Sequence, residues 1–228
     1  MRLGLPAGLA YLVEITSFTL MALFIARLGT TALASHQIAA SMAAVLYMMP
    51  LSIAIACSAR TSFWLGAGKP AHAKHVVLIG FKLVAVISCA LAATLFIAKE
   101  NLAALYSTSP GIIAMASTLL GWVALYHLAD GVQAVCAFLL RCYRITIAPL
   151  VVYSVLLWGA GLYGGYVLTY HGVEGVAGFA LNQPASQTPV SFWLAGTLAL
   201  MCVAACFMAL LWRAVRASQS GSRRRFEP

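Results

Sequence analysis

Four long stretches of the sequence contain no Asp, Glu, Lys or Arg, and each is longer than a membrane-spanning helix requires. They lie between the consecutive charged residues 27 and 60, 100 and 130, 144 and 174, and 174 and 213. About 20 apolar residues in helical form cross the hydrocarbon core of a bilayer, where the backbone must satisfy its own hydrogen bonds. The sequence therefore predicts an all-α membrane protein.

The composition supports this prediction and argues against a soluble protein. Of the 228 residues, 63% are hydrophobic and 8% are charged, whereas soluble domains carry about 25% charged residues. The net charge of +9 does not indicate a nucleic-acid partner, because the basic residues fall between and after the apolar stretches and form no binding face. The six cysteines lack metal-binding spacing and are interpreted as small hydrophobic residues.

The apolar stretches and the breakers between them predict six spanning helices. Their expected ranges are 5–26, 32–58, 76–98, 112–140, 147–170 and 191–212. Gly- and Pro-containing turns separate several of them, for example Gly66 to Pro70 and Ser107 to Gly111. We therefore expect one six-helix transmembrane domain over residues 1–212. Residues 213–228 are expected to be a disordered basic tail close to anionic lipid headgroups.

The basic residues are distributed very unequally between the two sides of this bundle. Twelve fall on the side of the termini and two, Arg27 and Lys99, on the other side. Because cytoplasmic loops carry an excess of Lys and Arg, we expect both termini in the cytoplasm. The twelve are Arg2, Arg60, Lys69, Lys74, Lys82, Arg141, Arg144, Arg213, Arg216, Arg223, Arg224 and Arg225.

Two of the five acidic residues, Glu14 and Asp130, fall inside predicted spans. Glu14 lies 12 residues from Arg2 and Asp130 lies 11 residues from Arg141, so both should sit roughly 17 to 18 Å from the cytoplasmic side. Burying a charged carboxylate in hydrocarbon costs at least about 2.5 kcal/mol on insertion scales. Two acids at one depth therefore predict a shared site for a proton or a small cation, which would neutralise the buried charge.

Tyr126, Asp130 and Gln133 extend this prediction, because their spacing of i, i+4 and i+7 places them on one face of a helix. Tyr126 would add an oxygen ligand or a hydrogen bond. An isolated acid can also be a tolerated, protonated group, and a lone Tyr more often packs than binds. The aromatic residues Tyr47, Tyr153, Trp158 and Tyr163 could line a substrate surface, but such residues are usually core or interface anchors.

Several short segments, in this order and spacing, resemble the second half of a MATE (multidrug and toxic compound extrusion) transporter of the NorM-like branch. They are Leu5-Pro6 with Glu14, Leu28-Gly29, and the segments 32–39, 49–53, 65–68, 105–106, 126–133 and 140–144. The resemblance covers nearly the whole chain. The chain departs from the family pattern where Tyr163 replaces the Pro usual in the fifth helix of this lobe.

The resemblance implies one lobe of a twelve-helix, two-lobe secondary antiporter in the bacterial inner membrane. Such a transporter exports drugs or organic cations in exchange for Na+ or H+ and needs no cofactor. Its C-terminal lobe binds the coupling ion with a Glu on the first helix and a Tyr and an Asp on the fourth. Glu14, Tyr126 and Asp130 occupy the matching positions.

Two other functions are weighed against an antiporter. The first is a truncated, non-transporting remnant or interaction protein that lacks an N-terminal lobe. The second is an intramembrane enzyme, which we do not expect because the sequence contains no HExxH or GxSxG motif. If the lobe acts in transport, it needs a cover for its polar face, either a second copy in a homodimer or a separately encoded N-terminal lobe.

Overall fold

The structure is a computed structural model that describes residues 4–172 and 185–223, and the secondary structure of these residues is helical. Within these residues, six helices are long and apolar enough to cross a membrane, as the sequence predicted. The elements are α1 (Gly4–Ala26), α2 (Thr30–Gly66), α3 (Pro70–Tyr106), α4 (Pro110–Cys142), α5 (Ile147–Tyr153), η1 (Ser154–Tyr163), α6 (Gly164–Tyr170) and α7 (Val190–Arg223). Together α5, η1 and α6 form the fifth span.

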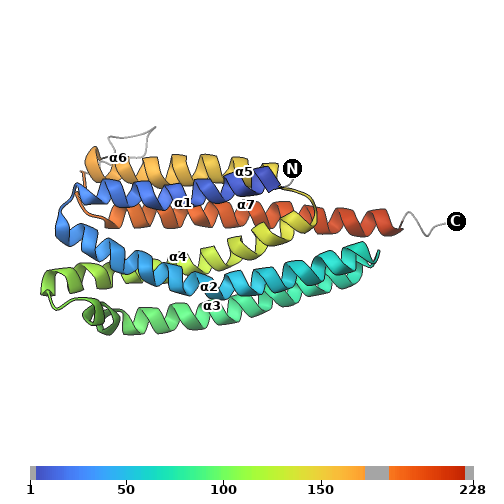
Figure 1. The fold of residues 1–228 in the computed structure, drawn as a ribbon, viewed down its shortest axis with the longest axis horizontal. Helices are drawn as coiled ribbons and strands as arrows, with labels where there is room; N and C mark the ends of the chain where they lie inside the picture. The colour runs from blue at the N-terminus through green and yellow to red at the C-terminus, as the bar shows by residue number, and fades with distance from the viewer. Residues whose placement is uncertain (1–3, 173–184, 224–228) are drawn as a thin grey trace, which may run out of the picture.

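The helices run roughly parallel to one long axis and alternate in direction (Figure 1). Helix α1 begins and α7 ends at one end of the bundle, where the α2–α3 and α4–α5 connections also lie (Figure 1). The α1–α2 and α3–α4 connections lie at the opposite end. This arrangement is the one that an even number of spans requires. Helix α4 is the central element and packs against α2, α3 and α7.

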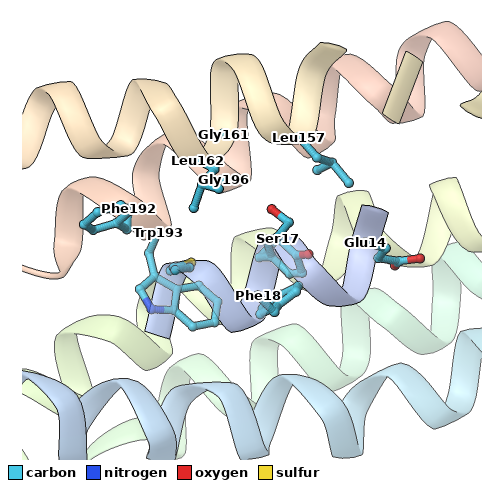
Figure 2. A pocket seen from close by; sticks show the side chains of 11 residues that line it. Glu14, Ser17, Phe18, Leu157, Gly161, Leu162, Phe192, Trp193 and Gly196 are labelled. Carbon is cyan, nitrogen blue, oxygen red and sulfur yellow. The ribbon is translucent and has the colours of Figure 1, made fainter. Parts of the chain in front are cut away.

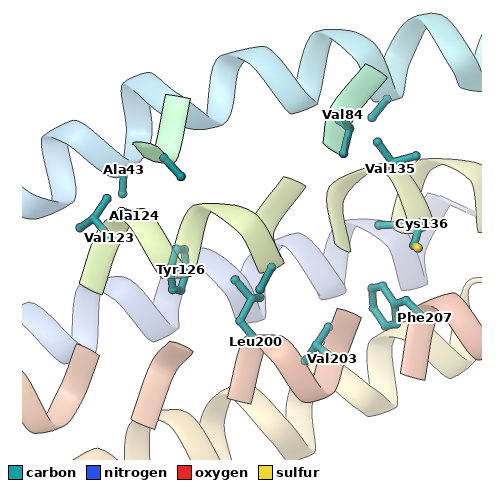
Figure 3. Close-up of a cluster of buried hydrophobic side chains, with 14 of the residues drawn as sticks. Ala43, Val84, Val123, Ala124, Tyr126, Val135, Cys136, Leu200, Val203 and Phe207 are labelled. Atoms are coloured by element: carbon teal, nitrogen blue, oxygen red, sulfur yellow. The ribbon is translucent and has the colours of Figure 1, made fainter. Parts of the chain in front are cut away.

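The core lies around α4, which buries side chains on most of its circumference. Figure 3 shows Tyr126 of this helix beside Leu200 of α7 and Cys136 beside Phe207. On the other side α4 approaches the α2–α3 pair closely: a Cβ placed on Gly131 would lie only 2.8 Å from Ser88 Oγ. Since lipid gives helices little hydrophobic reason to associate, close backbone approach at small residues supplies much of the packing energy.

Several helices extend beyond the predicted spans. Hydropathy indicates only the segment that lies in the bilayer, whereas a helix continues until a Gly, a Pro or a turn ends it. Helices α2 and α3 end at the predicted turns, where Gly68 has a φ of 69° and Pro70 opens α3. The prediction of a disordered tail from residue 213 is wrong for residues 213–223, which continue α7. Leu211 and Val215, both 1% exposed, are one turn apart and keep this extension packed on the bundle. Residues 224–228 and Glu174 lie outside the described part of the chain.

The fifth span is not the uniform α-helix that was predicted over 147–170. Its middle, Ser154–Tyr163, has the wider π-helical hydrogen bonding. Gly161 in this segment packs tightly against α7, because a Cβ there would lie 3.3 Å from the Ala199 Cβ. Short π-helical insertions often occur beside functional sites. Here Leu157 and Gly161 line a pocket that also contains Glu14.

Candidate cation site

The side-chain amide of Gln133 joins the two intramembrane acids. Its Nε2 donates to Asp130 Oδ1 at 3.1 Å and lies 3.4 Å from Glu14 Oε1, the acceptor of its second hydrogen bond. Asp130 and Gln133 are 5% and 1% exposed on α4, and Glu14 lies half-buried on α1. The structure therefore brings Glu14 and Asp130 together at one depth, as their distances from the basic residues predicted.

Tyr153 completes the hydrogen bonding of this amide from a third helix. Its hydroxyl donates to Gln133 Oε1, so both ends of the amide are engaged and its orientation is defined. Tyr153 is itself buried on α5 and packs edge-on against Phe207, with 5.0 Å between the ring centroids. The sequence interpretation of Tyr153 as a packing or surface aromatic missed this role, because the role depends on which helix lies opposite Gln133.

Tyr126 lies one turn before Asp130 on the same face of α4 and is 7% exposed. Its ring packs edge-on against Phe18 and Trp193, with centroid separations of 5.9 and 5.8 Å. Among the described residues, its hydroxyl has no hydrogen-bond partner within the protein. The hydroxyl is therefore available to a bound ion or water in the cavities that Tyr126 lines.

Three cavities meet at Glu14. The largest, about 390 Å³, lies between α1, α2 and α4 and is lined by both acids, Tyr126 and Tyr47. A second, about 350 Å³, extends from Glu14 past Gln133 and Tyr153. The third, about 30 Å³, lies between α1, α4, η1 and α7, and Figure 2 shows Glu14 at one of its ends. Since one water needs only about 10 to 15 Å³ of such space, the larger two cavities have room for water and a small ion beside the Glu14 carboxylate.

The second cavity also contains a positive charge. Arg141, an exposed residue in the last turn of α4, lines it together with Glu14 and Tyr153. A guanidinium at this position repels cations that pass between the site and this end of the bundle, and it attracts the carboxylate of Glu14. Glu14 thus shares this cavity with a basic side chain.

The ligand atoms of this site suit a hard cation or a proton. Carboxylate and phenol oxygens bind ions such as Na+, whereas thiolates and imidazoles favour transition metals. Within residues 4–172 and 185–223, no three His, Cys, Asp or Glu side chains form a cluster that could hold a metal ion. Carboxylates and a phenol are groups that can take up a proton or a small hard cation.

Comparison with known proteins agrees with the resemblance drawn from the sequence. The family model MatE matches residues 6–167. The probable multidrug resistance protein NorM of Aromatoleum aromaticum is 36% identical over 220 residues, which are 96% of this chain and 46% of that protein. The multidrug resistance protein MdtK of Photorhabdus laumondii is 37% identical over 166 residues, 73% of this chain and 36% of that protein.

Solved structures show the same fold. The crystal structure of the eukaryotic MATE transporter AtDTX14 superposes with a TM-score of 0.80 at 19% identity, covering 97% of this chain and 48% of that one. The six helices therefore correspond to one lobe of such a transporter. The chain spans about half the length of the curated relatives it matches.

Proposed function

The chain belongs to the MATE family, and from this premise we propose that it forms the ion-binding lobe of an antiporter that exports drugs or organic cations in exchange for Na+ or H+. It is a multi-pass membrane protein, and the part of the chain that the structure describes contains six helices able to span a membrane. The observation that carries the proposal is the Gln133 amide, which holds two intramembrane carboxylates together beside cavities that ions can enter.

In the proposed site Glu14 and Asp130 hold the coupling ion, and the hydroxyl of Tyr126 supplies a further oxygen. Gln133 and Tyr153 are positioning residues, because they orient the carboxylates and need not touch the ion. An ionised carboxylate in the membrane interior costs at least about 2.5 kcal/mol, so the site favours any state in which a cation or protons neutralise the pair. Binding or release of the ion therefore changes the net charge of the site.

The proposal also requires a cover for the face formed by α1 and α2. Helix α1 has only two buried residues, Ala10 and Ile25, and the 390 Å³ cavity beside it contains both acids. Polar groups left open to lipid cost several kcal/mol each. We propose that a second six-helix lobe, on the same or a separate polypeptide or as a second copy of this chain, covers this face. Alternating access then moves one lobe against the other, and one lobe alone does not support gradient-driven drug export.

A fluorescence titration of the purified chain tests the ion site. Trp193 lies 5.8 Å from Tyr126 by ring centroids, so its emission reports on the site. With the four other tryptophans replaced by Phe, Na+ is titrated at fixed pH, and pH is titrated at fixed Na+. We expect a saturable change in at least one titration. The first arm identifies Na+ and the second identifies protons as the ligand.

Three variants complete this test. Asp130→Asn and Glu14→Gln keep the shape and much of the hydrogen bonding but remove one charge each, so both should abolish the change. Glu100→Gln removes an exposed carboxylate near the end of α3, far from the site, and should leave it intact. A response that survives in both Asp130→Asn and Glu14→Gln would show that the paired acids do not bind the ion.

A further inference from the structure

Two cationic side chains from different helices meet on one indole ring. Lys74 Nζ, on α3, lies 5.6 Å from the centroid of the Trp212 ring, and Arg216 Cζ, one turn further along α7, lies 5.4 Å from it. A cation near an indole face is attracted by the negative potential of the ring. Both positive charges thus lie within 6 Å of one ring centroid, on the surface between α3 and α7.

No carboxylate of the described residues neutralises this pair. The acids in that part of the chain are Glu14, Glu100 and Asp130. Glu14 and Asp130 belong to the ion site, and Glu100 lies 26 residues after Lys74 on the same helix, about 39 Å along its axis. Like charges gathered around one ring repel each other, so an anion from outside the protein that contacts both would stabilise the arrangement.

The depth of the pair indicates the source of that anion. Trp212 closes the apolar run 191–212, and Lys74 precedes the apolar run 76–98, so both lie where the hydrocarbon region ends. Tryptophan is enriched at this boundary, and Lys and Arg there meet lipid phosphates. The same end of the bundle carries a second such ring, Trp64, with Lys69 Nζ 5.7 Å from its centroid. In Figure 1 this is the end where α7 passes the α2–α3 connection.

We propose that Lys74, Trp212 and Arg216 bind the phosphate of an anionic phospholipid. The Arg216 guanidinium and the Lys74 ammonium contact the phosphate oxygens, to which guanidinium binds with two parallel hydrogen bonds. The indole lies against the glycerol and the upper acyl chain. The bound lipid bridges α3 and α7, which contact each other and both pack against α4.

Native mass spectrometry of the purified chain in detergent tests the site with phosphatidylglycerol and phosphatidylcholine of identical acyl chains. We expect the wild type to retain phosphatidylglycerol preferentially. The double variant Lys74→Gln/Arg216→Gln should lose this preference by roughly 30-fold, the effect of removing two basic residues at a lipid surface. The variant Lys74→Arg/Arg216→Lys keeps both charges and should retain most of the preference.

The matched control is Arg27→Gln/Lys99→Gln, which removes two charges at the opposite end of the bundle. Lys99 also lies over an aromatic ring, 4.6 Å from the Phe96 centroid, so the control removes a cation–π contact as well. We expect it to keep the preference. If both double variants lost the preference for phosphatidylglycerol equally, net charge alone would explain it and the proposed site would be wrong. The site would also be wrong if neither double variant lost the preference. Displacement of phosphatidylglycerol by millimolar inorganic phosphate would assign the site to free phosphate and overturn the lipid proposal.

Discussion

The hydrogen bond between Tyr153 and Gln133 holds the candidate site in place, and a double-mutant cycle can measure it. Tyr153→Phe removes the donor and leaves the Gln133 Oε1 without its partner. Gln133→Leu removes the acceptor and also the donor to both carboxylates. The double variant replaces both buried partners by apolar groups, a change that is often nearly neutral for the bond itself.

The expected magnitudes follow from burial. Gln133 and Tyr153 are 1% and 4% exposed, so a group that loses its partner finds no water to replace it. Tyr153→Phe should lower the free energy of unfolding by about 1 to 2 kcal/mol, and Gln133→Leu by about 2 to 4 kcal/mol. Interhelical hydrogen bonds in membrane proteins show coupling energies of about 0.6 kcal/mol on average and about 1.7 at most. Full burial predicts a value in the upper half of this range, so the double variant should be more stable than the sum of the two single losses implies.

Unfolding by sodium dodecyl sulfate in mixed micelles, followed by circular dichroism, gives the four free energies. The matched control pairs Gln133→Leu with Tyr170→Phe, which removes a hydroxyl of the same span that donates to the Phe24 carbonyl at 2.7 Å. This control cycle should be additive. Additivity within about 0.3 to 0.5 kcal/mol in the Tyr153 cycle as well would refute the proposed link between α5 and the acid pair.

Two further predictions concern packing and topology. A Cβ on Gly165 would lie 2.7 Å from Phe192 Cδ1, so Gly165→Ala should lower the free energy of unfolding by about 1 to 3 kcal/mol in the same micelle assay. A Cβ on Gly159 would meet open space, so Gly159→Ala should leave the free energy of unfolding unchanged or raise it by up to about 1 kcal/mol. A reporter fused after Arg225 should be cytoplasmic and one inserted near Asn182 external, because twelve of the fourteen basic residues lie on the side of the termini; the opposite labelling would reverse the proposed orientation.

The number of spans could be predicted from the sequence, but their exact lengths and local form could not. Charge-free windows report what a bilayer tolerates. They stop at Arg60 and Arg213, although α2 and α7 continue to Gly66 and Arg223. The extension of α7 depends on Val215, whose burial against the bundle is a tertiary contact. The π-helical segment of the fifth span has the same apolar composition as an α-helix, so hydropathy carries no signal for it.

Part of the candidate site could also be predicted from the sequence. The shared face of Tyr126, Asp130 and Gln133 follows from helical periodicity, and the pairing with Glu14 follows from depth. The role of Gln133 as the link, and of Tyr153 as its donor, depends on which helices lie side by side around α4. A count of residues along one chain gives depth in the membrane, but it does not give the neighbour across a helix interface.

The claim that Glu14 and Asp130 form one ion site is tested most directly by counting bound ions. Equilibrium binding of radioactive sodium to the purified chain, with proton release or uptake recorded in the same sample, is compared among the wild type, Glu14→Gln, Asp130→Asn and Glu100→Gln. We expect the wild type and Glu100→Gln to bind Na+ or protons in one saturable event, in which binding of one ion depends on the concentration of the other. Glu14→Gln and Asp130→Asn should lose this event. Equal ion counts in all four proteins would contradict the site and, with it, the proposed role of this lobe in coupled transport.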